Sequence, residues 1–497
     1  MPGIVERPAL LAALGAVVAV VAFHLWITPS NPPGFHRDEV ALSLNAHTLS
    51  TTLRDEEGAF LPLFLRSYDD YKSPLYPYLL AGVFLVTGPE GQAARAFSAV
   101  LVLAAVLLLG LLARRLTGSW AVGVLVTVLG GAPPGLFELG RIAIEATTQP
   151  LLVVLVLLVL ERSSRLGRFD VRHGVVTGVL LTLLTYAYTG SRLLGPLLAV
   201  ALAVYAGGAG RRRLLVSAWA TFALGLVPMG VYAVRHPGAL TSRYEATTIA
   251  RDGLSGVDLV LQAAGNLFRD IDPWHWATAG DPAPYIHASG YGAFLAGVMA
   301  LSLVGAGLVL IRRRDDPWWR YVLLATLLVP VPAALTVDRY NAIRLAALPV
   351  FLLVLAIPTL DLLVRSLGRS WLARGVAAVI ALVVGLQLVQ FLDAYRARGP
   401  GRTVLFDAGV PALLDGPLAR GETIYVDFDD RGAHSQARWR AVVAGVPLDR
   451  VIVLPDGGIP PAGATVLTLF QECDFACEEI ARWEGYRLSR AAGPPTS

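Results

Sequence analysis

The chain is poor in charged residues: only 16% of its 497 residues are Asp, Glu, Lys or Arg, while 55% are hydrophobic. Soluble domains carry roughly 25% charged residues, so this composition excludes an ordinary soluble protein and predicts a membrane protein. Lysine is nearly absent, because Lys72 is the single one in the chain. The arginines stand in short loops between apolar runs and form no continuous basic face, so we expect no nucleic-acid partner.

Cysteine is scarce as well. Cys473 and Cys477 are the two cysteines of the sequence, which excludes a metal cluster built from cysteine ligands. They are four residues apart in a tail that we expect outside the membrane, where a local disulfide can form. Two reduced thiols are the alternative.

Long hydrophobic runs make up most of the rest. A helix that crosses about 30 Å of hydrocarbon needs roughly 20 apolar residues. The first such run ends without a small-x-small cleavage site, so we interpret it as an uncleaved anchor. Eleven segments meet or approach this length and are predicted to span the membrane: 9–27, 92–113, 119–138, 146–161, 174–190, 193–208, 213–234, 290–311, 318–337, 343–364 and 371–392.

The shorter apolar segment 75–87 decides the topology, because counting it as a span reverses everything that follows. Short cytoplasmic loops carry an excess of Arg and Lys. If 75–87 does not cross and the N-terminus is cytoplasmic, all five basic loops share the cytoplasmic side. These loops are Arg114–Arg115, 161–172, Arg211–Arg213, Arg312–Arg314 and 365–374. We therefore predict a multi-pass plasma-membrane protein with about 11 transmembrane helices, in which 75–87 is re-entrant or interfacial.

This topology predicts three extracytoplasmic parts: the loop 31–91, the long loop 235–289 and the tail. In the first loop, 40–55 is expected to form a juxtamembrane interfacial helix, and Asp55, Glu56 and Glu57 are expected on a solvated turn.

The tail alternates three strand-like runs with turns and one helix-like run, which predicts a small α/β domain. The strand-like runs are "ETIYVDF", "RVIVLP" and "ATVLTLF", and the helix-like run is "ACEEIARWEGY". We expect two domains, a transmembrane domain over 1–392 and an extracytoplasmic one over 393–497.

Candidate functional groups gather in the first outer loop. Asp38 and Glu39 stand where the first span leaves the bilayer, and ionisable groups at that depth are functional candidates unless they belong to an ordinary acidic loop. Lys72 carries a compact charge that suits a phosphate. Simple pairing of Lys72 with Asp69 or Asp70 is the alternative.

Other polar residues are expected on the same side of the membrane. Arg141 and Glu145 either line a cavity or form an i,i+4 pair. Arg192 either snorkels or binds an anion. Arg339 and Arg344 lie in a charged cluster that either binds phosphate or pairs within itself.

Three histidines are candidate metal ligands or hydrogen-bond partners. His36 is expected to be a local hydrogen-bond partner of the nearby carboxylates. His275 and His287 are the remaining candidates for a metal, but lone loop histidines seldom bind one, so no metal ligand is predicted.

The first outer loop and the second span resemble a known family. The stretches that carry the resemblance are "FHRDEVALSLNAHTL" (35–49), "KSPL" (72–75) and "AARAFSAVL" (93–101). They are similar to bacterial GT-C glycosyltransferases of the protein-O-mannosyltransferase-like kind (glycosyltransferase family 39) and, more distantly, to lipid A aminoarabinose transferases. The match is dense over about 30–115 and looser beyond, and the tail matches no family known to us.

The resemblance implies a GT-C fold and an enzyme that uses a polyprenyl-phosphate sugar on the extracytoplasmic side. Asp38 would be the general base of an inverting displacement, and Glu39 would hold Asp38 or the acceptor. Lys72, with Arg192 and Arg344 as helpers, would neutralise the phosphate of the leaving lipid. The residues expected to line the cavity are His36, Tyr71, Tyr76, Arg95, Arg141, Glu145 and Arg339.

Substrates and partners follow from the same resemblance. We expect membrane lipids, the lipid-linked donor, and an acceptor that is a protein, a lipid or a wall polymer. Some relatives place a glutamate of a metal site just before the lysine, where this chain has Tyr71, so a divalent metal is not expected to be essential.

Two other classes of protein remain as alternatives. A transporter or flippase for a lipid-linked sugar would show polar residues deep in its spans and repeat symmetry. A non-catalytic scaffold gives no reason for Asp38, Glu39 and Lys72 to stand together.

Overall fold

The computed structural model describes residues 7–26, 30–67, 70–206, 208, 210–250, 255–288, 290–426, 431–455, 457–469, 473 and 475–492. Its internal contacts divide the chain into two compact units. Unit 1 holds the described residues of Met1–Ile27, Ser73–Leu75 and Ser98–Arg396. Unit 2 holds those of Thr28–Lys72, Tyr76–Phe97 and Ala397–Ser497.

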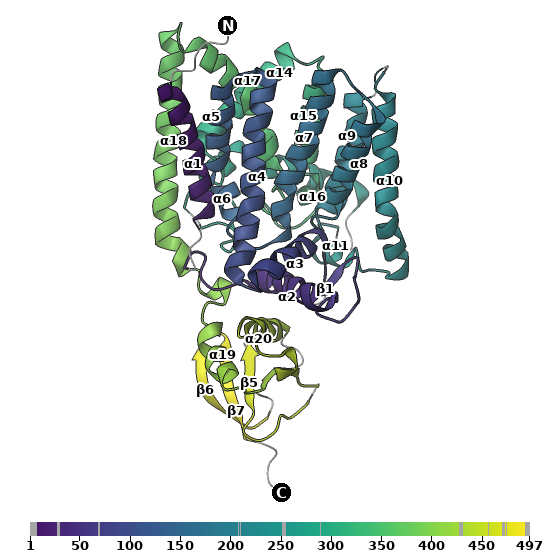
Figure 1. The fold of residues 1–497 in the computed structure, drawn as a ribbon, viewed down its shortest axis with the longest axis vertical. Coiled ribbons are helices and arrows are strands. Elements are labelled where there is room, and N and C mark those ends of the chain that lie inside the picture. Colours follow the sequence, from purple (N-terminus) through teal and green to yellow (C-terminus); the bar gives the residue numbers. More distant parts are fainter. Residues whose placement is uncertain are drawn as a thin grey trace. The chain divides into compact units, whose positions relative to one another are not determined.

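Unit 1 is built from helices that run side by side (Figure 1). Helix α8 packs against α7, α9 and α10, and α14 packs against α17. The long helices are α1 (Arg7–Leu25), α4 (Gly91–Thr117), α5 (Trp120–Gly131), α7 (Thr148–Leu166), α8 (Val171–Thr185), α9 (Ser191–Ala206), α10 (Arg212–Arg235), α14 (Ala296–Arg312), α15 (Pro317–Leu328), α17 (Leu348–Ser366) and α18 (Trp371–Arg398). The other elements of unit 1 are α6 (Pro134–Leu139), η1 (Glu145–Thr147), α11 (Ser242–Thr247), α12 (Gly256–Asp270), α13 (Pro273–Thr278) and α16 (Val331–Ala334).

Each predicted span contains a helix, although several helices are shorter than predicted. Prolines explain two interruptions of the predicted spans. Pro133 precedes α6 and Pro134 begins it, and Pro330 stands directly before α16. Within the described part of the chain, five helices are long and apolar enough to cross a membrane: Gly91–Thr117, Glu145–Leu166, Arg212–Arg235, Leu348–Ser366 and Trp371–Gly401. The chain is therefore a helical membrane protein in outline, and the number of crossings stays a prediction.

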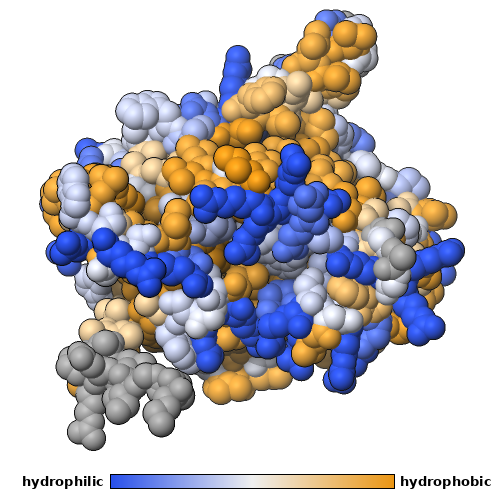
Figure 2. Space-filling model, turned by 90° about the horizontal axis from the view of Figure 1, so that it is seen from above, coloured by the Kyte–Doolittle hydropathy of each residue, from blue (hydrophilic) through white to orange (hydrophobic). Residues whose placement is uncertain are grey.

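The arginine-rich connections of unit 1 lie at one end of its helices. They follow α4, α7, α9, α14 and α17, and Figure 1 shows these connections at the same end. Hydrophilic side chains gather on that face in Figure 2, between hydrophobic patches. The guanidinium of Arg114 lies 3.4 Å from the ring centroid of Trp120. A single arginine-rich face agrees with the reasoning behind the predicted topology, and the side of the membrane that it faces stays a prediction.

The first outer loop forms two helices and a hairpin. Helix α2 (Arg37–Thr52) agrees with the predicted interfacial helix, displaced by about three residues. Strands β1 (Leu65–Ser67) and β2 (Asp70–Lys72) pair antiparallel. Helix α3 (Leu75–Thr87) begins directly after Pro74, and its 13 residues span only about 20 Å. The path of 75–87 relative to the bilayer stays a prediction.

The tail contains a five-stranded mixed sheet with the order β4-β3-β5-β7-β6. Strand β3 pairs parallel with β4 and β5, and β7 pairs antiparallel with β5 and β6. Its strands are β3 (Ile424–Val426), β4 (Val451–Val453), β5 (Thr465–Leu469), β6 (Cys477–Trp483) and β7 (Tyr486–Ala491), and its helices are α19 (Val410–Ala419) and α20 (Arg431–Val443). Short 3-10 turns are η2 (Gly399–Gly401), η3 (Val404–Phe406) and η4 (Leu448–Arg450).

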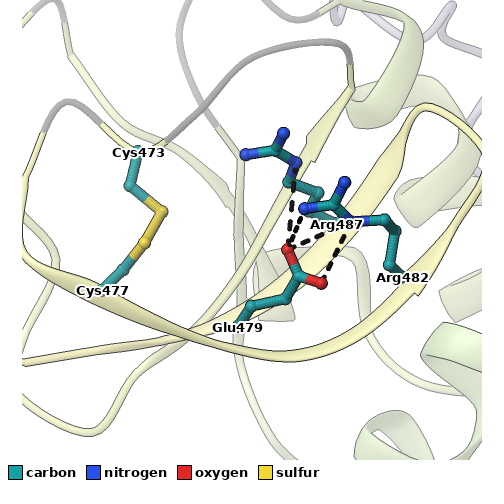
Figure 3. Close-up of a disulfide and its surroundings, with 5 residues drawn as sticks. All are labelled: Cys473, Cys477, Glu479, Arg482 and Arg487. Carbon is teal, nitrogen blue, oxygen red and sulfur yellow. Dashed lines mark hydrogen bonds and ion pairs between the residues drawn. A yellow bond between two sulfur atoms is a disulfide. The ribbon is translucent and has the colours of Figure 1, made fainter.

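One prediction for the tail is wrong. The helix-like run "ACEEIARWEGY" forms β6 and the turn into β7, because a two-residue turn returns the chain so that Trp483 faces Tyr486. Cys473 and Cys477 form a disulfide, and Glu479 of β6 pairs with Arg482 and Arg487 (Figure 3). The three predicted strands are present as β3, β4 and β5. The tail shares unit 2 with the first outer loop, so the domain boundaries 1–392 and 393–497 stay a prediction.

Candidate functional site

The start of α2 positions the two candidate carboxylates. His36 is the N-cap, and its Nδ1 accepts a hydrogen bond from the Asp38 backbone N–H at 3.2 Å. In return the His36 backbone N–H donates to Oε2 of Glu39 at 2.9 Å, which completes a capping box. Carboxylates in the first turn also interact favourably with the helix dipole. Adjacent side chains on a helix diverge by about 100°, so Asp38 and Glu39 face different surroundings.

Glu39 is buried in a bidentate ion pair with Arg95. Arg95 Nε and Nη2 donate to Oε1 and Oε2 of Glu39 at 2.8 and 2.7 Å, and both side chains are within 1% of full burial. Arg95 Nη1 donates to the carbonyl of Pro32 at 2.8 Å. Such planar paired bonds are strong and geometrically specific. Glu39 therefore fixes the start of α2 and is too buried to hold an acceptor.

Asp38 instead meets Lys72. Lys72 Nζ lies 3.3 Å from Oδ1 of Asp38 and 3.6 Å from Oδ2 of Asp70, and the Asp38 side chain is 40% exposed. The β1–β2 hairpin brings Lys72 to this place, since it pairs Leu65 with Lys72. Pairing of Lys72 with Asp70, the alternative raised from the sequence, is therefore present beside the Asp38 contact. Asp69 lies outside the described residues.

The surroundings of Asp38 favour its ionised form. Burial raises the pKa of the Asp38 carboxyl, but the Lys72 ammonium, His36 and Arg37 together hold this pKa well below its usual range. Asp38 is therefore a carboxylate at neutral pH, held beside a cation and half open to solvent.

The two candidate tyrosines lie in β2 and α3. Tyr71 is half-buried in β2 opposite Arg66. Tyr76 is fully buried in α3, where its hydroxyl donates to the Ala94 carbonyl at 3.2 Å. The buried position of Tyr76 indicates a packing role behind the site.

The acidic turn after α2 is only partly solvated, since Glu57 is exposed as expected but Asp55 and Glu56 are not. Asp55 and the side chain of Glu56 are each 4% exposed. Burial raises the pKa of the Glu56 carboxyl to about 7, although Ser67 and Arg438 act in the opposite direction. The closest Arg438 nitrogen is 4.0 Å from Oε2 of Glu56. Nothing in the local sequence indicated that residues of the tail would cover this turn.

Unit 1 holds the predicted arginine cluster, and most of its members pair within the unit. Arg339 Nη1 lies 2.9 Å from Oδ2 of Asp270. Arg344 Nη2 lies 2.8 Å from Oδ2 of Asp338, which is the self-pairing alternative for this residue. Asp270, from α12, was not among the predicted residues, because it is 69 positions away from Arg339.

The remaining predicted residues of unit 1, Arg141, Glu145 and Arg192, lie in different surroundings. Arg141 Nη2 donates to the Phe23 carbonyl at 2.7 Å, and its guanidinium lies 4.1 Å from the Phe137 ring centroid. Glu145 begins η1 and is 7% exposed. Arg192 Nη1 donates to the Leu240 carbonyl at 2.9 Å. Arg141 and Arg192 therefore bond to different backbone carbonyls of unit 1.

The two loop histidines have protein partners at their ring nitrogens. His275 Nε2 lies 2.7 Å from the Gly280 carbonyl, and its ring stacks on Tyr340. His287 Nδ1 lies 2.5 Å from Oε2 of Glu138, and its Nε2 lies 2.8 Å from the Tyr291 carbonyl. Among the described residues, no group of three or more His, Cys, Asp or Glu side chains is placed to hold a metal.

Comparison with known proteins rests on structure. No family model matches the sequence, and a search of curated proteins finds no match. ArnT from Cupriavidus metallidurans bound to undecaprenyl phosphate gives a TM-score of 0.64 at 12% identity over 99% of this chain and 100% of that one. The oligosaccharyltransferase AglB from Archaeoglobus fulgidus, in complex with an inhibitory peptide and a dolichol-phosphate, gives 0.51 at 14% identity over 94% and 70%.

These structural neighbours define the fold of the chain. The oligosaccharyltransferase from Archaeoglobus fulgidus in the apo form also matches, with a TM-score of 0.54 at 16% identity over 89% of this chain and 65% of that one. ArnT and AglB have the GT-C fold, and the chain shares it. This likeness confirms the fold that the resemblance in the first outer loop implied.

Proposed function

We propose that the chain is a membrane glycosyltransferase that moves a sugar from a polyprenyl-phosphate donor to an acceptor hydroxyl on the extracytoplasmic side. The observation that carries this proposal is the Asp38–Lys72 ion pair, 3.3 Å long, in a chain with the GT-C fold. The ArnT neighbour was solved with undecaprenyl phosphate, which supports a lipid-phosphate donor for the chain.

The proposed reaction is a single displacement. Asp38 accepts the proton of the acceptor hydroxyl while the oxygen attacks the anomeric carbon. A new carbon–oxygen bond forms to the acceptor, and the bond from that carbon to the phosphate oxygen breaks. The electron pair of that bond stays on the phosphate, which leaves as polyprenyl phosphate with one more negative charge. Attack opposite the leaving group inverts the anomeric centre.

Lys72 has two roles in this proposal. It binds the phosphate and balances the charge that develops on it during transfer. In the absence of donor it pairs with Asp38 and keeps the Asp38 pKa low. When Lys72 turns to the phosphate, the Asp38 carboxylate loses part of this stabilisation and becomes a stronger base. Donor binding would thereby prepare the base for the acceptor.

The other predicted residues have supporting roles in the proposal. Glu39 and Arg95 hold the start of α2 in place for Asp38. Arg192 and Arg344, both in unit 1, remain candidate phosphate-binding groups, and each is open to test by its own substitution to Met. The acceptor class and the identity of the sugar are part of what the assay below would determine.

The test uses the purified full chain in lipid with a panel of polyprenyl-phosphate hexoses and pentoses and a cell-envelope extract as acceptor. Release of polyprenyl phosphate is followed by mass spectrometry. Asp38→Asn is expected to lower kcat by about 10²- to 10⁴-fold, since a general base contributes that much. Lys72→Met is expected to raise KM for the donor and to lower kcat.

Asp415→Asn is the matched control, because Asp415 is a tail carboxylate that pairs with Arg440 at 2.6 Å. It is expected to leave transfer unchanged. Transfer by Asp38→Asn within threefold of the wild type would refute the base assignment. Movement of the lipid-linked sugar across the bilayer without any transfer would favour the flippase alternative.

A further inference from the structure

The tail contacts the segment that leads into α2. Within unit 2, α20 packs against α2. Arg402 Nη2 lies 3.3 Å from Oδ1 of Asn31, and Arg438 donates to the backbone carbonyl of Glu56 at 3.2 Å. These contacts join the tail to the first outer loop both before and after the helix that carries Asp38.

Phe35 lies at the centre of these contacts with the tail. Its backbone N–H donates to the Phe406 carbonyl at 2.6 Å, and its carbonyl accepts a hydrogen bond from Gln436 Nε2 at 3.0 Å. Its ring stacks on Trp439 with the centroids 5.3 Å apart. Residues of the tail therefore hold both backbone polar groups and the side chain of Phe35.

The tail and this segment touch so closely that the residue before Phe35 must be glycine. Gly34 has a positive φ of 59°, and a Cβ there would lie 2.1 Å from the Phe406 carbonyl oxygen. Such an approach leaves little freedom for the segment to move without the tail.

The contacts of Phe35 with the tail affect Asp38, which follows Phe35 by three positions. His36 follows Phe35, its ring meets Phe406 edge to face at 5.9 Å, and it caps α2 through the Asp38 N–H. The direction in which the Asp38 side chain leaves α2 depends on this cap. Displacement of a reacting group by about 1 Å can cost roughly 10²-fold in rate.

We propose that the tail is a positioning element for the candidate base, and that Gln436 and Trp439 hold Phe35 so that Asp38 stays beside Lys72. The proposal rests on the proposed function, because it explains how Asp38 is held for catalysis. Gln436 suits the role, since it is 2% exposed and its Nε2 also donates to Oδ2 of Asp407 at 2.7 Å. Its two N–H groups thus tie the Phe35 carbonyl to the turn that precedes α19.

The single lysine of the chain makes this positioning measurable without an activity assay. An amine-reactive reagent labels Lys72 and the N-terminal amine, and peptide mass spectrometry separates the two products. Pairing with the Asp38 carboxylate favours the charged, unreactive form of the amine. The rate of Lys72 labelling at fixed pH therefore reports whether the Asp38–Lys72 pair is intact.

Gln436→Met keeps the volume of the side chain but removes both donated hydrogen bonds. It is expected to raise the Lys72 labelling rate about threefold and to lower kcat about tenfold, with KM for the donor nearly unchanged. Trp439→Leu, which leaves Gln436 in place, is the second variant and is expected to act in the same direction. Arg440→Ala is the matched control on α20, because Arg440 pairs with Asp415 inside the tail.

Folding of each variant is checked by thermal unfolding of the full chain in lipid. Wild-type labelling rates in both folded variants, measured beside an increase in Asp38→Asn, would overturn the positioning role and leave the proposed function intact. Faster labelling in both variants together with a lower kcat supports positioning, and faster labelling with a wild-type kcat would overturn it. Retained transfer by Asp38→Asn would remove the base assignment without changing the labelling result.

Discussion

Asp38 and Glu39 are neighbours at the start of α2, yet the two sides of the helix that they face have little in common. On one side, Asp38 is 40% exposed and shares the Lys72 ammonium with Asp70 over 3.3 and 3.6 Å. On the other side, Glu39 is fully buried and forms a bidentate pair with Arg95 at 2.7 and 2.8 Å. On the Asp38 side, two carboxylates share the Lys72 ammonium. On the Glu39 side, Arg95 forms two hydrogen bonds to one carboxylate.

This contrast separates a pair that can exchange partners from one that cannot. Lys72 is 13% exposed and lies beside Asp70 as well, so it keeps a carboxylate partner when it leaves Asp38, and breaking this pair costs less than breaking a fully buried one. Breaking a buried pair leaves a charge without water and costs several kcal/mol. The Asp38 side is therefore suited to chemistry in which Lys72 changes partner, while the Glu39 side holds the helix start. The predictions below test this division.

The largest effect is expected for the buried pair. Arg95→Met leaves the Glu39 carboxylate buried without its guanidinium, which typically costs about 3–5 kcal/mol. We expect a clearly lower Tm and a lower yield of folded protein.

The double variant Glu39→Gln with Arg95→Met removes the uncompensated charge and should recover part of the lost stability. Thermal unfolding of both variants in lipid checks the prediction. A single variant as stable as the wild type would mean that the pair does not fix the helix.

Much of the fold could be predicted because it depends on local sequence. Apolar runs long enough for a bilayer located the helices of unit 1, and the basic loops between them lie at one end of these helices. Asp38 stood out because it follows the first span, and Lys72 because it is the single lysine, although the two residues are 34 positions apart. Strand β6 was misread because its hairpin turn was not recognised, and the turn decides that pairing.

The rest depends on partners that are distant in the sequence. Gln436 and Phe35 are 401 positions apart, and Arg95 and Glu39 are 56 apart, so no local pattern reveals either contact. The division of labour between Asp38 and Glu39 follows from these partners, which decide which side of the helix is buried. The burial of Glu56 has the same cause, since Arg438 of the tail lies over it.

An intermediate effect is expected at Glu56, a buried carboxyl without a bidentate partner. Its pKa is about 7 in the folded chain against 4.5 for the ordinary group. Between these values the unfolded chain has lost a proton that the folded chain keeps, so stability falls as pH rises and the full penalty is present above pH 7. Glu56→Gln removes this penalty, which is at most about 3 kcal/mol.

The measurement for Glu56 is Tm against pH for the wild type and Glu56→Gln. The variant should be more stable than the wild type at pH 8 and should lose this advantage towards pH 5. Its backbone carbonyl still accepts the hydrogen bond from Arg438, so that contact is matched between the two proteins. Parallel Tm curves over this range would show that Glu56 does not titrate as described.

The smallest effect is expected at Asp70, the second carboxylate beside Lys72. Asp70→Asn removes a charge that competes with a donor phosphate for the ammonium, and the amide oxygen can still accept the hydrogen bond from the Tyr71 backbone N–H. A partly exposed pair is worth about 0.2–1 kcal/mol, so KM for the donor should fall by no more than about fivefold, with kcat nearly unchanged. Steady-state kinetics beside Asp38→Asn separate the two carboxylates, because one competes for Lys72 and the other takes a proton. A large fall in kcat for Asp70→Asn would instead make Asp70 a participant in the chemistry, and the proposed role of Asp38 as sole base would have to be shared.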